Sequence, residues 1–229
     1  MAEVVEKLPY YILQTMSLTK KGSIRKREIL RLDDAYKVSN QFGESEKAEF
    51  ESDWEQASIF TEEVLKRLIR TDDEGFGVVN SKFIPYIVML PVFSALLGYV
   101  TERKDYPKCK RKIRYWYWNN VFSNNYSGST DSQGESDFKD MKTWIEDDGK
   151  SPYEFVSVDD IQTSAQTSAD YKGILCLIAK EGAKDFFKDD PPDYSSLHDH
   201  HIFPQSKSKQ YNASKDEINS VFNRTLIFE

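Results

Sequence analysis

The sequence contains little cysteine. Its 229 residues include two cysteines, Cys109 and Cys176, which lie far apart and form no CxxC pair. Their separation argues against a disulfide framework or a zinc knuckle, and it fits the reducing conditions of a cytoplasmic protein. Cys176 lies inside an apolar run, so we interpret it as a core residue.

A recognisable targeting segment is also missing. The N-terminal residues contain no basic region followed by an apolar core, which a secretory signal requires. The stretch from Phe83 to Val100 carries no charge and is long enough on count alone to cross a membrane. Pro85, Pro91 and Ser94 interrupt it, however, and a pair of buried helices explains it equally well. We therefore expect no membrane partner.

The chain has no overall excess of positive charge. Its net charge is −7, which weakens the case for nucleic-acid binding, because neutralising phosphates supplies most nonspecific affinity for DNA. Basic residues gather in two blocks, Lys20–Arg31 and the denser Arg103–Arg114. Each block is either part of a DNA track or a solvated helix face, and the sequence favours neither.

Apolar residues are plentiful enough for a folded core. The chain is 39% hydrophobic and 14% aromatic, and its length suits one large or two small domains. Helical spacing of apolar residues predicts helices near residues 24–40, 46–70, 91–101 and 109–122. Ser132 and Glu135 have the spacing of a capping box, which predicts that a further helix begins there.

An aromatic run in the last of these four helices has two interpretations. Tyr115, Trp116, Tyr117 and Trp118 follow one another, and rows of rings are typical of surfaces that stack nucleobases. Consecutive residues of a helix point in different directions, however, and cannot form one platform. We therefore expect these rings to pack in the core.

The most distinctive stretch lies near the C-terminus. It holds every histidine of the chain, His198, His200 and His201, within four positions and beside Asp199. Histidine is a common metal ligand and the usual general base near neutral pH, so this group is a candidate metal and proton-transfer site. The alternative is a solvated polar turn. We favour the site, because Ile202–Pro204 predicts a short buried strand that a turn then ends.

Two strings in this region carry a resemblance to a known family. The run from His200 to Ser206 resembles the first motif of the HNH, or ββα-metal, endonucleases, and the run from Ile218 to Ile227 is similar to the second. Within that family the chain most resembles the nuclease region of GmrSD-like, modification-dependent restriction proteins. Strings within 112–144 and 171–186 are similar to the helical region that precedes the nuclease motif there. The resemblance covers the last half of the chain well and the first third loosely.

This resemblance implies a role for each residue of the site. His201 matches the family's general base and His200 its first metal ligand, with Asp199 as a further source of oxygen ligation. Asn223 is expected to brace the loop between the strands and to help orient the imidazole of His201. The implied cofactor is a divalent metal, Mg²⁺ or Mn²⁺, and an imidazole in place of the family's usual carboxylate shifts the preference toward Mn²⁺, Zn²⁺ or Ni²⁺.

One departure from the family pattern concerns the end of the site. Members of the family carry a further Asn or His in a helix after the second strand, and this chain reaches Glu229 without it. We therefore expect a fragment, or a site that a partner completes, and poor DNA cleavage by this chain alone. The ParB-like domain that precedes the nuclease region in the full-length proteins also has no counterpart here.

The predicted fold is mainly α. A helical domain is expected over residues 1–190 and an incomplete ββα-metal element over residues 191–229, after an acidic, proline-containing break at 189–193. Strands are expected near 199–204 and 223–228. The predicted function is metal-dependent hydrolysis of DNA in a prokaryotic restriction or phage-defence protein, and the alternative is a noncatalytic helical scaffold with a vestigial nuclease motif. The expected partners are DNA, modified DNA included, a ParB-like domain or partner subunit, and a second copy of the chain as a homo-oligomer.

Overall fold

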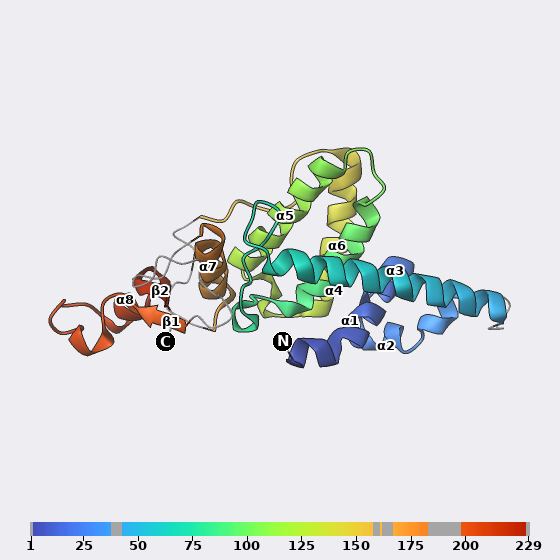
Figure 1. The fold of residues 1–229 in the computed structure, drawn as a ribbon. Coiled ribbons are helices and arrows are strands. Elements are labelled where there is room, and N and C mark those ends of the chain that lie inside the picture. The colour runs from blue at the N-terminus through green and yellow to red at the C-terminus, as the bar shows by residue number, and fades with distance from the viewer. Residues whose placement is uncertain (1, 38–42, 158–160, 162–166, 183–197, 228–229) are drawn as a thin grey trace. The chain divides into compact units, whose positions relative to one another are not determined.

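Across the residues that the structure describes, the fold is mainly helical, with a two-stranded sheet near the C-terminus (Figure 1). The structure is a computed structural model that describes residues 2–37, 43–157, 161, 167–182 and 198–227. The predicted fold class, mainly α with a short C-terminal sheet, is confirmed. In chain order the helices and strands are α1 (Ala2–Lys21), α2 (Lys26–Ile29), α3 (Glu44–Ile69), α4 (Leu90–Val100), α5 (Tyr106–Phe122), α6 (Thr130–Asp147), α7 (Ala169–Lys180), β1 (His198–His201), α8 (Lys215–Asn219) and β2 (Arg224–Ile227).

The chain divides into two compact units. The boundary predicted near residue 190 and the acidic break at 189–193 lie outside the described residues, so the division into domains 1–190 and 191–229 stays a prediction. The first unit consists of residues 1–65, 86–120 and 125–155, and the second of residues 66–85, 121–124 and 156–229.

Helix α4 lies in the core of the first unit. Its residues are apolar almost throughout, and a helix of this kind is stable only when other elements surround it. Pro91 stands in its first turn, where a missing backbone N–H costs no helical hydrogen bond, and the helix predicted at 91–101 is confirmed. The helix packs against α1 and α6. Its largest buried side chains are Leu90, Val92, Phe93, Leu96, Leu97 and Val100.

The charge-free stretch that ends at Val100 does not form a single long helix. It contains a short 3-10 turn at Ile87–Met89, which is followed by the 11 residues of α4. Within the described residues, no helix combines the length and the apolar composition that crossing a membrane requires.

The aromatic run of α5 contributes to the core of the first unit. Trp116 is fully buried and meets Phe93 of α4 edge to face, with ring centroids 6.0 Å apart. The indole Nε1 of Trp116 donates to Asp137 Oδ2 of α6 at 2.8 Å, and Tyr126 OH donates to the same oxygen at 2.7 Å. Tyr115, by contrast, is 39% exposed. The rings therefore point in different directions, and core packing is confirmed for Trp116.

The helix predicted over residues 24–40 is wrong. The described residues there form α2 and a separate 3-10 turn at Leu32–Ala35. The turn places Leu32 and Tyr36 in a cluster with Met16 of α1 and Ala57 of α3. Packing against two other helices therefore overrides the helical spacing of the segment.

The predicted capping box at Ser132 and Glu135 is also wrong. Helix α6 begins at Thr130, one turn earlier, so both residues lie inside the helix. Glu135 instead accepts hydrogen bonds from Ser23 Oγ and the backbone N–H of Ile24, and it pairs with Arg25. The carboxylate joins the start of α2 to α6 and is not available for a cap.

In the second unit, α7 packs closely against neighbouring backbone. A Cβ at Gly173 would lie 2.7 Å from Val121 Cγ1, and one at Gly77, whose φ is +71°, would lie 2.1 Å from Cys176 O. Only glycine fits at such close approaches. Cys176 is fully buried and its thiol donates to Phe83 O at 3.3 Å, which confirms the predicted core position.

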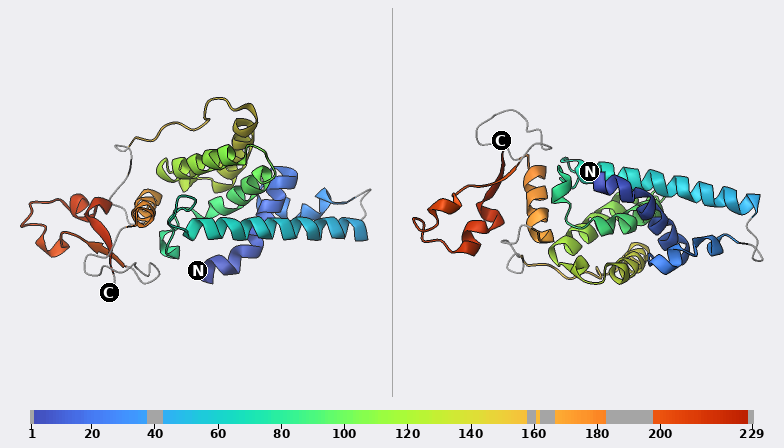
Figure 2. Two further views of the ribbon diagram at one scale, coloured as in Figure 1. Left: turned by 45° about the horizontal axis from the view of Figure 1, so that its top comes forward. Right: turned by 90° about the horizontal axis from the view of Figure 1, so that it is seen from below.

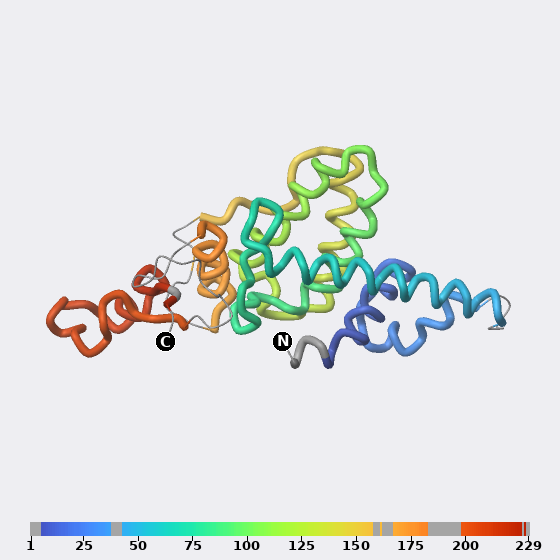
Figure 3. The backbone as a smooth tube through the Cα atoms, viewed as in Figure 1, coloured from blue at the N-terminus to red at the C-terminus, as the bar shows by residue number. Residues whose placement is uncertain are grey.

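The C-terminal hairpin lies in the same unit. β1 and β2 pair antiparallel, with His198 opposite Ile227 and His201 opposite Arg224, and both views in Figure 2 show the two strands side by side. The segment between them, traced by the tube in Figure 3, includes α8. Ile218 of α8 is buried.

The strand predicted over Ile202–Pro204 is not buried. β1 ends at His201, and Ile202 and Phe203 are 42% and 55% exposed. The backbone N–H of Ile202 still bonds to Asn223 O, but that of Phe203 bonds to the Asn223 side chain. The polar side chain takes the place of a strand partner, so the ladder stops there.

Candidate functional site

His201 ends β1, and its imidazole meets the side chain of Asn219 at the end of α8. Nε2 of His201 lies 3.2 Å from Asn219 Oδ1. The amide nitrogen of Asn219 donates to Lys215 O at 2.9 Å, and this bond turns Oδ1 toward the histidine. Because a carbonyl oxygen accepts, Nε2 carries the proton, and in the neutral imidazole Nδ1 keeps the lone pair. Nδ1 is therefore the atom of His201 that can take up a proton.

Helix α8 is short and needs its cap. A helix of five residues is marginal alone. Ser214 and Glu217 form a complete capping box, in which each side chain accepts a hydrogen bond from the other's backbone N–H. The backbone N–H of Ser214 and then its side chain lower the pKa of Glu217, so the carboxylate stays charged at the helix N-terminus. The cap thus fixes the helix that presents Asn219.

Asn223 braces the loop that follows His201. Its Oδ1 accepts from the backbone N–H of Phe203 at 2.8 Å. Its Nδ2 donates to Phe203 O at 3.0 Å and to Ile218 O at 2.8 Å. These bonds correspond to the bracing expected of Asn223. The contact to the imidazole itself, however, comes from Asn219.

Asp199 is occupied by two protein partners. Its Oδ2 accepts a hydrogen bond from Tyr171 OH of α7 at 2.6 Å, and its Oδ1 lies 3.6 Å from Arg224 Nη1. Arg224 Nη2 in turn donates to Asn219 Oδ1 at 3.4 Å. A continuous series of polar contacts therefore runs from Tyr171 through Asp199, Arg224 and Asn219 to His201.

Neighbouring residues of β1 point to opposite faces of the strand. His198 and His200 are exposed, whereas Asp199 and His201 are half-buried on the other face. His200 Nδ1 lies 2.9 Å from His201 O, so Nδ1 carries the proton and Nε2 remains available as a ligand atom. The two predicted metal ligands, Asp199 and His200, are thus not brought together. Among the described residues, no group of three or more His, Cys, Asp or Glu side chains is arranged to hold a metal ion.

An open hollow lies beside the histidine. It has a volume of about 440 Å³, within the usual range of ligand pockets. The hollow brings one imidazole together with two cationic side chains, one carboxylate and two amides. Its lining includes His201, Gln205, Lys215, Asp216, Asn219 and Arg224.

Sequence reasoning misses three residues of this arrangement. Asn219 stands in the Ile-Asn-Ser string that resembles the second motif, but the resemblance assigns the supporting role to Asn223. Arg224 follows Asn223 directly and is 6% exposed, an unusual position for arginine that the sequence does not reveal. Tyr171 lies 28 residues before its partner Asp199, and no local pattern indicates such a contact.

Comparison with known proteins adds one relative. The chain is 31% identical over 235 residues to a protein of Methanocaldococcus jannaschii that bears the name "Uncharacterized protein MJ0686". The match covers 97% of this chain and 37% of the relative, so the chain spans little more than a third of that protein's length. No protein-family profile and no solved structure matches the chain.

Proposed function

We propose that the hairpin is the hydrolytic site of a DNA endonuclease, with His201 as the general base. The observation that carries the proposal is the contact between His201 Nε2 and Asn219 Oδ1. It orients the ring and selects the tautomer, while Nδ1 makes no hydrogen bond within the described residues. One ring nitrogen of His201 is thus hydrogen-bonded to a described residue and the other is not, and the ring lines a hollow. This arrangement suits a general base better than a histidine that only packs.

The charges around the hollow favour an anionic substrate. Lys215 and Arg224 line it together with His201, and arginine held in a fixed orientation recognises phosphate oxygens well. Asp199 supplies that orientation for Arg224. Both cations stabilise the extra negative charge that a phosphodiester acquires when a nucleophile attacks its phosphorus.

The reaction that we propose is hydrolysis of one P–O bond. A water oxygen forms a bond to phosphorus, and the proton of that water goes to His201 Nδ1. The bond from phosphorus to the 3′ oxygen breaks, and the departing oxygen takes up a proton from solvent. Asn219 keeps Nε2 protonated throughout, so the imidazolium that forms is stabilised by its carbonyl oxygen.

A divalent metal is part of the proposal through the resemblance to HNH endonucleases. The described side chains do not fit a complete metal site, because Asp199 is engaged by Tyr171 and Arg224 and lies on the strand face opposite His200. His200 Nε2 is a single ligand atom of suitable tautomer. We therefore assign the base and the anion-binding groups to this chain and route no step through a metal.

The proposal is tested by nicking of supercoiled plasmid DNA in Mg²⁺, Mn²⁺, Zn²⁺ or Ni²⁺, with EDTA as the metal-free condition. We expect slow, metal-dependent nicking that His201→Ala reduces by about 10²–10⁴-fold. His198→Ala is the matched control, because it removes an exposed imidazole from the other face of the same strand. Equal nicking by the parent and the His201→Ala variant would contradict the assignment.

The alternative function is a noncatalytic helical scaffold. The incomplete set of metal ligands among the described residues favours it. Absence of nicking under all four metals, with a folded chain by circular dichroism, would support the scaffold. The setting in a prokaryotic restriction or phage-defence protein, and the expected ParB-like partner, belong to the same proposal.

A further inference from the structure

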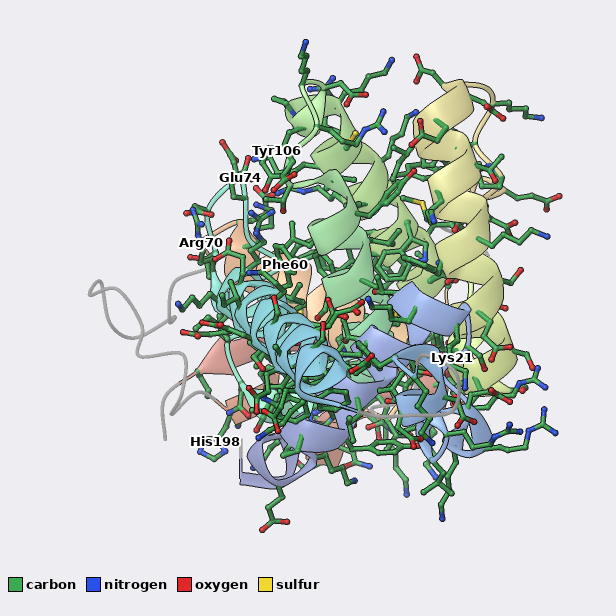
Figure 4. All side chains as sticks on the ribbon, turned by 90° about the vertical axis from the view of Figure 1, so that its right-hand side faces the viewer. Lys21, Phe60, Arg70, Glu74, Tyr106 and His198 are labelled. Carbon is green, nitrogen blue, oxygen red and sulfur yellow. The ribbon has the colours of Figure 1, made fainter. Side chains whose placement is uncertain are left out.

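Most cations of the first basic block, one of the two candidates for a DNA track, are paired with carboxylates of the first unit. Lys21, labelled in Figure 4, forms an ion pair with Glu28 at 2.8 Å. A cation that already faces a carboxylate releases fewer counterions when a phosphate approaches, so it contributes little to DNA affinity. The other ion pairs of this block are Lys20 with Glu49 and Asp53, Arg25 with Glu135, Arg27 with Glu28, and Arg31 with Asp34.

Three cations of the second basic block, Arg103, Lys108 and Lys112, are paired in the same way. Lys108 and Lys112 both contact Asp148 and lower the pKa of that carboxyl to about 2. Lys112 is buried and also donates to Trp144 O at 2.6 Å, so it serves the packing of α5 against α6. Arg103 pairs with Asp105 and Glu146.

Lysines of a different segment are not paired. We call residues 202–215, between β1 and the start of α8, the hairpin loop. It carries Lys207, Lys209 and Lys215, and all three are exposed. Within the described part of the chain, none of the three forms an ion pair. Their charge is therefore available to an anion, and Lys215 already lines the hollow at His201.

The same loop exposes two aromatic rings. Phe203 and Tyr211 are 55% and 44% exposed, and their rings meet edge to face with centroids 5.3 Å apart. Exposed rings of this size next to cations are typical of surfaces that bind single-stranded nucleic acid, where bases stack on the rings and phosphates meet the lysines.

The hairpin loop is held in shape by its own backbone. The N–H of Tyr211 donates to Lys207 O at 3.2 Å, and that of Ala213 donates to Ser208 O at 3.1 Å. Asn212, with φ of +50°, takes the left-handed conformation that closes the turn. The lysines and rings therefore sit on an ordered segment, which lowers the entropy cost of binding a strand.

We propose that the hairpin loop is a nucleic-acid contact surface, on which Lys207 and Lys209 neutralise phosphates while Phe203 and Tyr211 stack on bases next to the phosphate at His201. The ligand is a DNA strand with unstacked bases, single-stranded or locally opened. This inference rests on the proposed function, because His201 fixes where the cleaved phosphate lies.

The test measures DNA binding separately from cleavage. Fluorescence anisotropy of labelled single-stranded and duplex DNA is recorded at several salt concentrations, with His201→Ala in every protein to prevent cutting. In Lys207→Gln/Lys209→Gln, we expect weaker binding and a slope of log affinity against log salt that is smaller by about 0.7–0.9 for each lost contact. Lys104→Gln/Lys150→Gln is the control, because it removes two exposed lysines from the first unit.

A second variant examines the rings. We expect Tyr211→Ser to weaken binding of single-stranded DNA by about fivefold or more and to leave the salt slope unchanged, since stacking involves no counterion. Its effect on duplex DNA should be smaller. Circular dichroism of each variant confirms that the fold is retained.

The outcomes separate this inference from the proposed function. Binding that depends on the hairpin loop, without plasmid nicking by the active chain, supports the surface and overturns the nuclease. Nicking that depends on His201, with equal binding by parent and loop variants, overturns the surface and leaves the nuclease. Absence of DNA binding by the parent, or an assembly of two copies that Tyr211→Ser dissociates in sedimentation, also overturns the surface.

Discussion

Replacing Asn223 by aspartate is a sharp test of how the site is held. The two side chains have the same shape, so Asn223→Asp changes hydrogen bonding and charge but not volume. The Oδ1 bond from the backbone N–H of Phe203 is retained. The Nδ2 donor, however, is replaced by an oxygen that faces Phe203 O and Ile218 O. Both carbonyls lose their donor and meet a second acceptor.

The expected cost follows from these two contacts. A buried carbonyl left without its donor costs about 1–3 kcal/mol, so two of them cost roughly 2–6 kcal/mol. The bond to Phe203 O is only part-buried, which favours the lower part of this range. A loss of about 2 kcal/mol corresponds to roughly 30-fold faster exchange of amide protons protected by the hairpin. The amides to follow are those of Ile202 and Phe203.

The same variant should respond to pH. Burial raises the pKa of the introduced carboxyl in the folded state, because the charged form is poorly solvated there. A group of this kind stabilises the fold below its unfolded-state pKa of about 3.9, and that stability is lost as the pH rises through the higher folded-state pKa. The amide protons of Ile202 and Phe203 should therefore be better protected from exchange near pH 4 than near pH 7. Hydrogen exchange of Asn212→Asp, which makes the same change at an exposed loop position, is the control. Equal protection in both variants would refute the bracing role of Asn223.

Two further predictions concern the supports of the fold. Tyr171→Phe removes the hydroxyl that donates to Asp199. We expect a loss of about 1.5–3 kcal/mol in local stability, measured as faster exchange of the β1 amide protons. The control variant Tyr211→Phe should leave this exchange unchanged. Asp137→Asn tests the buried carboxyl that Trp116 and Tyr126 contact. Burial raises the pKa of Asp137, so urea unfolding should show stability that falls as the pH rises above about 4, and this part of the pH dependence should vanish in the variant.

Local patterns in the sequence predict some elements of this protein well. The spacing of Phe50, Trp54, Val64 and Leu68 indicates the helix that the structure shows as α3. The strands predicted near 199–204 and 223–228 overlap β1 and β2, although β1 ends at His201. In α3 and β2 the local preference of the residues agrees with the tertiary packing, so the sequence alone indicates these elements.

Other features depend on partners that are distant along the chain. Ser132 and Glu135 have the spacing of a capping box, but the Glu135 carboxylate instead accepts a hydrogen bond from Ser23 and pairs with Arg25. The ion-pair partner of Lys108 is Asp148, which lies 40 residues later. Helix α1 has no distinct start signal in the sequence, and its buried residue Met16 packs against segments that follow much later. Such contacts are set by the fold, and no window of neighbouring residues contains them.

The position of Asp199 shows why the role of a residue requires its neighbours in space. From the sequence, an aspartate beside three histidines indicates a metal ligand. In the structure, strand alternation places Asp199 on the face of His201 and away from His200. On that face it meets Tyr171 and Arg224, and Arg224 reaches the asparagine that holds His201. The carboxylate is thus placed to orient the site through Arg224. A metal bound by His200 must therefore obtain its other ligands from residues other than Asp199.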